Sequence, residues 1–307
     1  MHILIPNLRR TLLLVVFLPL ASFNMTSGDV VQIKATPEIV EQGSIVEIAL
    51  PTLKVNQVKS ISLVGVKSVA PIAFTKDIST TFFIPIDLKL SPKEYTVRVV
   101  SITGRIREVK INVIARNVPT LDFMPGVDHT ATSTDPNSTM NVAALSNLSK
   151  ENAQLKNVPT NNKITWKNQD FIWPVKNKVT ITDIYGYSRS VQNTVTTHKG
   201  IDFRAPIGTP VYAMQKGIVR IAKKFTLYGN TVVIDHGKGI HTLYMHLDSI
   251  SVKENKLIDQ GTELGKSGQT GYSFGPHLHM SVWVNGISID PLSFMSLYDK
   301  KADEFAL

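Results

Sequence analysis

The sequence predicts an all-β protein made of two β-rich units joined by a polar segment. Short runs rich in β-branched residues and separated by turn residues fill residues 30–115. Within them, apolar and polar residues alternate through 94–102 and 107–115 around Thr103-Gly104, which is typical of a half-buried hairpin. After residue 166 the runs are again strand-like and are punctuated by glycines, and no long helix is expected. We therefore expect a small immunoglobulin-like β-sandwich followed by a mostly antiparallel β-sheet unit.

The N-terminus has the features of a secretory signal peptide, which we assign to residues 1–28. Arg9 and Arg10 precede an apolar run from Thr11 to Phe23, and small and polar residues follow. The run is shorter than the roughly 20 residues that a helix needs to cross a bilayer. We expect cleavage within 21–28, although no clean A-x-A site is present. An uncleaved anchor is the alternative, and only in that case do we expect membrane association. Either way, we expect an exported protein, periplasmic or extracellular.

Composition narrows the classes of partner and chemistry. The chain has 33 Lys and Arg against 24 Asp and Glu, which favours attraction to polyanions such as cell walls. It has no arginine-rich tract and no interleaving of aromatic and basic residues, so no nucleic-acid partner is expected. The absence of cysteine excludes disulfides, a thiol nucleophile and a thiolate zinc site.

The remaining boundaries follow from composition. Residues 29–115, the predicted sandwich, carry no cluster of ionisable residues, so we expect a spacer or docking module there. Residues 116–165 are rich in Pro, Thr, Ser and Asn, which indicates a linker with a short helix near 143–156. Residues 166–298 form the second unit, and 299–307 are a C-terminal tail.

Six of the eight histidines lie in the second unit: His198, His236, His241, His246, His277 and His279. His277 and His279 are two apart on a predicted strand, so their side chains share one face. His198 and Asp202 are four apart around Gly200, which would let the backbone turn so that both side chains converge. His246 ends an apolar run, TLYMHL. For His236 and His241 we expect structural roles.

Together these residues suit a catalytic zinc site. Such a site has three protein ligands from His, Asp or Glu and keeps one position open for water. It also needs a base for that water and a donor to the developing oxyanion. Two histidines and an aspartate for the metal, with two histidines left over, supply this set without a serine or cysteine nucleophile.

The second unit resembles the lysostaphin-type, or LytM-type, zinc metallopeptidases of bacterial cell walls. The resemblance covers nearly all of 171–295 and includes HKGIDFRAPIGTPVYAMQKGIV, YGNTVVIDHGKGIHTLYMHL and GTELGKSGQTGYSFGPHLHMSV. It implies one zinc ion per chain held by His198, Asp202 and His279, and catalytic roles for His246 and His277. It also implies a mostly antiparallel β-sheet metallopeptidase domain.

Two positions depart from the family pattern. Asn255 stands where a turn glycine is common, and Asn tolerates positive φ better than other residues with a side chain. Met280 stands where an aromatic residue often follows the last ligand, which would alter a subsite wall.

The resemblance implies an endopeptidase that hydrolyses peptide cross-links of peptidoglycan with zinc-activated water. His277 would accept the proton of the water and His246 would donate a hydrogen bond to the tetrahedral intermediate, although the two roles can be exchanged. The bond that is cut stays open between stem cross-links and glycine-rich bridges. The alternatives are a non-enzymatic regulator of other wall hydrolases, a wall-binding structural protein, and an enzyme kept latent by its linker or first domain.

Overall fold

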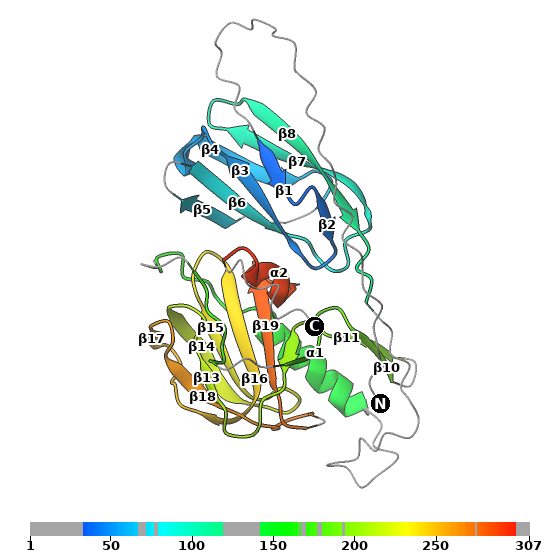
Figure 1. Cartoon of the computed structure of the whole chain (residues 1–307), viewed down its shortest axis with the longest axis vertical. Coiled ribbons are helices and arrows are strands. Elements are labelled where there is room, and N and C mark those ends of the chain that lie inside the picture. The colour runs from blue at the N-terminus through cyan, green and yellow to red at the C-terminus, as the bar shows by residue number, and fades with distance from the viewer. Residues whose placement is uncertain are drawn as a thin grey trace, which may run out of the picture. The chain divides into compact units, whose positions relative to one another are not determined.

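The all-β prediction is confirmed by a computed structural model of the chain (Figure 1). The structure describes residues 33–66, 72–76, 79–118, 142–164, 166, 170–176, 180–191, 194–273 and 275–298. The predicted signal peptide, the C-terminal tail, and residues 119–141 and 165 of the predicted linker lie outside these residues. Among the described helices, none is both long enough and apolar enough to cross a membrane.

The first unit consists of two four-stranded sheets around one core. One sheet has the order β1 (Lys34–Thr36), β3 (Ile45–Leu50), β6 (Ser79–Pro85), β5 (Ile72–Lys76). The other has the order β2 (Ile39–Glu41), β8 (Ile106–Ile114), β7 (Lys93–Ser101), β4 (Val58–Leu63), and a short 3-10 helix spans Val55–Gln57. Residues from both sheets share one buried cluster, as in a β-sandwich.

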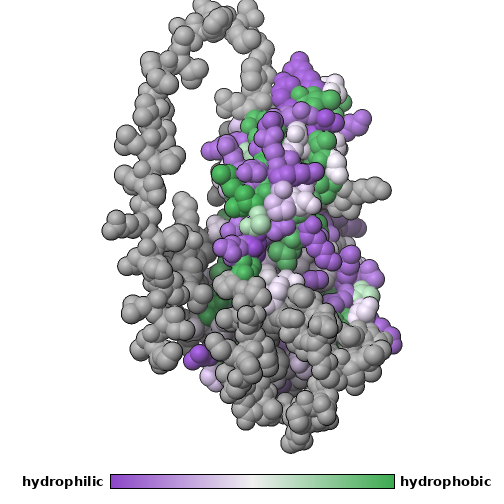
Figure 2. Space-filling model, turned by 90° about the vertical axis from the view of Figure 1, so that its right-hand side faces the viewer, coloured by the Kyte–Doolittle hydropathy of each residue, from purple (hydrophilic) through white to green (hydrophobic). Residues whose placement is uncertain are grey.

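The predicted hairpin is formed by β7 and β8. Tyr95 pairs with Ile111 across the two strands, and both side chains are buried together with Val97 and Val99. Alternate residues such as Arg98 point away from the core and are exposed. On the face of the molecule shown in Figure 2, hydrophilic side chains separate the apolar patches of the described residues.

The second unit contains a ten-stranded sheet, in which β14, β15, β16 and β19 lie side by side (Figure 1). Its main path runs β17 (Leu257–Ile258), β14 (Gly217–Phe225), β15 (Gly229–Asp235), β16 (Ile240–Ile250), β19 (Leu278–Val284), β12 (Ile201–Phe203), β9 (Ile181–Asp183). Off this path are β13 (Pro210–Tyr212), β18 (Glu263–Ser267) and β20 (Ile287–Ile289). All the paired strands of this sheet are antiparallel, and β10 (Ser188–Val191) and β11 (Thr194–Thr197) form a separate pair.

The central strand β16 is buried on both faces from Ile240 to Leu247, which explains its nearly continuous apolar run. On one face, Tyr244 and Leu247 belong to the main core of the second unit. On the other face, Leu243 and Met245 belong to a smaller buried cluster.

Leu155 of helix α1 (Val142–Lys156) belongs to that smaller cluster, so α1 covers this face of the sheet. The short helix predicted near 143–156 is therefore present, and it packs on the sheet that carries the histidines. A second short helix, α2 (Pro291–Met295), begins after Asp290, whose carboxylate accepts a hydrogen bond from the Leu292 amide.

Candidate metal centre

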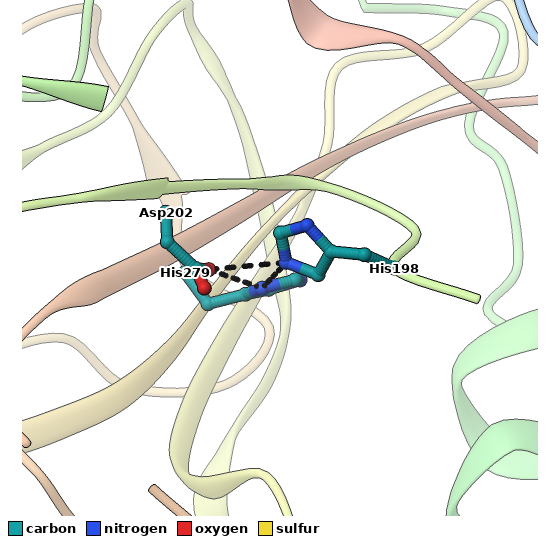
Figure 3. A group of neighbouring side chains, drawn as sticks. All are labelled: His198, Asp202 and His279. Carbon is teal, nitrogen blue, oxygen red and sulfur yellow. Dashed lines mark hydrogen bonds and ion pairs between the residues drawn. The ribbon is translucent and has the colours of Figure 1, made fainter. Parts of the chain in front are cut away.

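Three side chains from two neighbouring strands and the loop before them converge at one point of the ten-stranded sheet (Figure 3). Asp202 on β12 lies directly opposite His279 on β19, and His198 reaches in from the loop that precedes β12. The Oδ1 of Asp202 is 2.8 Å from Nδ1 of His279 and 3.1 Å from Nε2 of His198. The two imidazole nitrogens are themselves 3.0 Å apart. Cross-strand pairing thus brings together residues that are 77 positions apart in the sequence.

The neighbours of the two rings fix which nitrogen of each faces this point. Nδ1 of His198 donates to the carbonyl oxygen of Ile184 over 2.8 Å, which leaves the lone pair on Nε2. Nε2 of His279 lies 2.9 Å from the hydroxyl of Ser281, so Nδ1 is left for the shared point. Hydrogen bonds of this kind hold metal-binding histidines in one tautomer and orientation.

Gly200 has a steric role at this site. A Cβ atom at this position would meet the carbonyl oxygen of Met280 and would lie 2.7 Å from both the His279 ring and the Ser281 hydroxyl. Gly200 is not among the glycines with positive φ. The backbone nevertheless bends at Gly200, as expected, and its hydrogen side chain also lets the loop approach β19 closely enough for His198 to reach Asp202.

The electrostatics of the three side chains are dominated by burial and by the charge of Asp202. Burial by itself would raise the pKa of Asp202, but its contacts with His198 and His279, which can donate to it when they are protonated, hold this pKa well below its usual value. Burial lowers the pKa of His198, yet the bond to Asp202 outweighs it and leaves this pKa raised. Burial prevails at His279, whose pKa is lowered. An ionised carboxylate held between two imidazoles is an environment that favours a bound cation.

His246 and His277 lie beside these three residues. Their ring centroids are 4.8 Å apart, and the centroid of His246 is 6.2 Å from that of His279. Nε2 of His277 is 3.9 Å from Oδ1 of Asp202, while its Nδ1 donates to the carbonyl oxygen of Gly275 over 2.8 Å. Burial and the two neighbouring histidines lower the pKa of His246 to about 3. The neutral form of His246 therefore predominates above that pH.

The backbone of His246 is unusual. Its φ is +58°, in the left-handed region that residues with a side chain seldom occupy. Between the pairs Asn230–Leu247 and Val232–Tyr244, β16 has one residue more than β15, so His246 sits at a β-bulge. Bulges of this kind redirect a side chain and are frequent near active sites.

The structure also places the other singled-out residues. His236 is fully buried, with Nδ1 3.0 Å from the Lys216 carbonyl oxygen and Nε2 2.7 Å from the Thr242 hydroxyl, in agreement with a structural role. Asn255 has a φ of +64°, as predicted. Met280 is buried in the main core, so the prediction that it lines a subsite wall is wrong. Its side chain lies on the opposite face of β19 from His279 because successive residues of a strand alternate.

Sequence reasoning missed the groups that orient the four rings facing the centre. Three of them are backbone carbonyls, of Ile184, Thr270 and Gly275, for which side-chain identity gives no signal. The fourth, Ser281, follows His279 by two positions on β19, and this spacing does place it on the same strand face.

The donor set fits a catalytic zinc site: two imidazole nitrogens and one carboxylate, each with a single ligand atom, lie within 4.8 Å of one another. Among the residues that the structure describes, His198, Asp202 and His279 are the group of His, Asp and Glu side chains whose ligand atoms lie this close together. The fold and the site thus define a candidate metal-dependent hydrolase centre.

Comparison with known proteins agrees with this class. Residues 196–291 match the model of Peptidase family M23. The peptidoglycan DD-endopeptidase ShyA of Vibrio cholerae is 38% identical over 122 residues, which are 39% of this chain and 28% of that protein. The DD-carboxypeptidase/endopeptidase Mpg of Neisseria meningitidis is 40% identical over 114 residues, 37% of this chain and 26% of that protein. The matches thus span about a quarter of the length of these relatives.

A solved structure shares the fold over most of the chain. A Pseudomonas aeruginosa protein described as a peptidase M23 matches 86% of this chain and 97% of its own, with a TM-score of 0.59 and 20% identity. The segment that matches the Peptidase family M23 model, residues 196–291, contains all five candidate site residues.

Proposed function

We propose that this protein is a zinc metalloendopeptidase that hydrolyses peptide cross-links of bacterial peptidoglycan. The convergence of His198, Asp202 and His279, with two further imidazoles beside them, is the observation that carries the proposal. The names of the relatives ShyA and Mpg support the substrate class.

In this proposal one zinc ion is held by Nε2 of His198, Oδ1 of Asp202 and Nδ1 of His279. When bound, zinc polarises the scissile carbonyl and lowers the pKa of a water molecule towards 7. The chain contributes the preset tautomers of both histidines and an ionised carboxylate, since the pKa of Asp202 lies well below its usual value.

His277 is the proposed general base. Because its Nδ1 donates to the Gly275 carbonyl oxygen, Nε2 carries a lone pair directed towards Asp202, 3.9 Å away. This nitrogen can accept a proton from the attacking water and return it to the leaving amine.

His246 is proposed to orient the same water. Its Nδ1 donates to the Thr270 carbonyl oxygen over 2.8 Å, so the neutral ring presents Nε2 without a hydrogen. The sequence-based assignment, donation to the tetrahedral intermediate, would require a second proton on a ring whose pKa is lowered to about 3. Water has two O–H groups: one can donate a hydrogen bond to Nε2 of His246 while the proton of the other passes to His277.

The non-enzymatic regulator is not favoured, because the residues whose loss would indicate it, His198, Asp202 and His279, are all present and close enough together to hold a metal ion. We further propose that residues 1–28 direct export to the periplasm or beyond, and that 29–115 act as a spacer or docking module. A latent state, in which part of the linker 116–165 or the first domain covers the site, stays a prediction, and residues 119–141 and 165 of that linker lie outside the described part of the chain.

The test is digestion of purified peptidoglycan by the wild-type protein and by His279→Ala, with mass spectrometry of the soluble products. We expect fragments in which a peptide bond between stems has been cut, absent with the variant. Equal release by both proteins, or release of products with cut glycan strands, would contradict the proposal.

A further inference from the structure

Helix α1 contributes a buried carboxylate to the second unit, from outside the segment that matches the M23 family model. Glu151 is only 6% exposed. Its oxygens accept hydrogen bonds from three successive backbone amides of the turn between β14 and β15: Thr226 at 2.7 Å, Leu227 at 3.1 Å and Tyr228 at 3.4 Å. Hydrogen bonds to an ionised carboxylate are roughly twice as strong as neutral ones. Glu151 therefore holds this turn in place.

The same turn supports the backbone of His246. The carbonyl oxygen of Tyr228 accepts the His246 amide proton over 3.0 Å, at the bulge where φ is positive. The carbonyl oxygen of Leu227 accepts from the Tyr272 amide over 2.8 Å. The 226–228 turn thus points its amides to Glu151 and its carbonyl oxygens to the amides of His246 and Tyr272. A shift of the turn would move both.

A second set of contacts leads from the turn to the His246 ring. Gly229 approaches the Thr270 backbone so closely that a Cβ atom would not fit, and the Asn230 amide donates to the Thr270 hydroxyl over 2.9 Å. That hydroxyl in turn donates to the carbonyl oxygen of Leu247. The carbonyl oxygen of Thr270 accepts a hydrogen bond from Nδ1 of His246. Both the backbone and the ring of His246 are therefore held by residues adjacent to the Glu151 turn.

We propose that Glu151 is a positioning residue for catalysis, which acts through the 226–228 turn to hold His246 and Thr270 in the arrangement that the reaction needs. The inference rests on the proposed function for the role of His246. The strained backbone of His246 persists only where the surrounding structure enforces it, and the hydrogen bonds of Glu151 to the turn are part of that support. The competing explanation is that Glu151 only stabilises the fold.

Four α1 variants separate these explanations. Glu151→Ala removes the acceptor, and Glu151→Gln keeps one of its two oxygens as a conservative rescue. Leu155→Ala removes packing from the same helix, since Leu155 is buried in the smaller cluster. Gln154→Ala is the matched surface control, because Gln154 is exposed and contacts Lys223.

The full chain, loaded with zinc, is assayed on a purified cross-linked muropeptide dimer well below the unfolding midpoint of each variant. We expect Glu151→Ala to lower kcat by about tenfold or more with KM changed less than about twofold, because misplacing a catalytic group costs rate more than binding. Glu151→Gln should recover part of kcat. Leu155→Ala should lower the unfolding midpoint with kcat near wild type. Equal kcat losses in Glu151→Ala and Leu155→Ala at matched stability would overturn the proposal.

Amide hydrogen exchange tests the role of Glu151 without relying on activity, so its result does not depend on whether the proposed function is correct. Amide hydrogen exchange should rise at His246 and Tyr272 in Glu151→Ala but not in Gln154→Ala. If the wild-type chain cleaves no muropeptide, the proposed function fails, and amide exchange alone decides whether Glu151 holds His246. Unchanged exchange at His246 in Glu151→Ala would overturn the positioning role whatever the activity.

Discussion

Nδ1 of His246 donates its proton to the carbonyl oxygen of Thr270 over 2.8 Å. This one bond determines that the neutral ring faces the candidate metal centre with an unprotonated Nε2. His246 thus combines a ring held in one tautomer by Thr270 with a strained backbone of its own, whose φ is positive. Strain of this kind costs about 1–3 kcal/mol and is concentrated at active sites.

His246→Asn should separate activity from stability. Asn occupies the left-handed region more readily than His, so relief of backbone strain should offset part of the lost packing. We expect an unfolding free energy within about 1 kcal/mol of wild type, retained zinc, and kcat lower by about 10²–10⁴. Calorimetry, metal analysis and the muropeptide assay check this, and a variant that keeps wild-type kcat would remove His246 from the mechanism.

Gly200→Ala should weaken metal binding without unfolding the chain. The new methyl group would collide with the Met280 carbonyl oxygen and press on the His279 ring, which displaces the loop that carries His198. We expect zinc affinity to fall by about 10–100-fold, as for other disturbed ligand supports. Gly275→Ala is the control, because a Cβ there meets no atom within 4 Å. Equal zinc affinities of the two variants, measured by competition with a chelating dye, would contradict the steric account.

The stability of the fold should fall in mild acid because of His236. Complete burial lowers the pKa of His236 from 6.5 to about 4, so the unfolded chain binds more protons than the folded one between these values. Stability is then fully present above pH 6.5 and is lost as the pH falls towards 4, by at most about 3 kcal/mol from this group. Denaturant unfolding across this range should show the loss, and His236→Gln should reduce it but not abolish it, because the lowered pKa of His246 contributes in the same range. An equally steep loss in the variant would assign the effect elsewhere.

Helix α1 should be needed by the catalytic unit. It buries Leu155 against the sheet and carries Glu151, so a chain of residues 142–307 keeps contacts that a chain of 166–307 lacks. We expect the longer fragment to be active and the shorter one to have at least about tenfold lower kcat or a lower unfolding midpoint. Comparing the two fragments with the full chain is the measurement. Equal kcat and stability of both fragments would show that α1 is dispensable.

Sequence patterns predicted those parts of the site that depend on local geometry. The spacing of His277 and His279 places both on one face of a strand, and the pairing of β12 with β19 then sets Asp202 opposite His279. The positive φ of Asn255 also followed from residue type, because Asn tolerates it.

The rest of the site depends on contacts between distant segments that a single sequence does not reveal. Nothing in TLYMHL shows that His246 occupies a bulge with positive φ, because the bulge arises from its register with β15. Glu151 lies in a segment that reads as a linker, and its role depends on a turn 75 residues later in the chain. Strand alternation alone predicts that Met280 points away from His279 and into the core, where it lies. The expectation of a subsite wall came instead from the aromatic residue that is common at this position in the family.

The central claim is tested most directly by zinc content and activity measured on the same protein. The full chain is stripped with a chelator, assayed on the muropeptide dimer, and titrated back with zinc. We predict that activity disappears with the metal and returns in full at about one zinc per chain. Full peptide-bond cleavage by the zinc-free protein, or zinc bound stoichiometrically to an Asp202→Ala variant that remains fully active, would contradict the account.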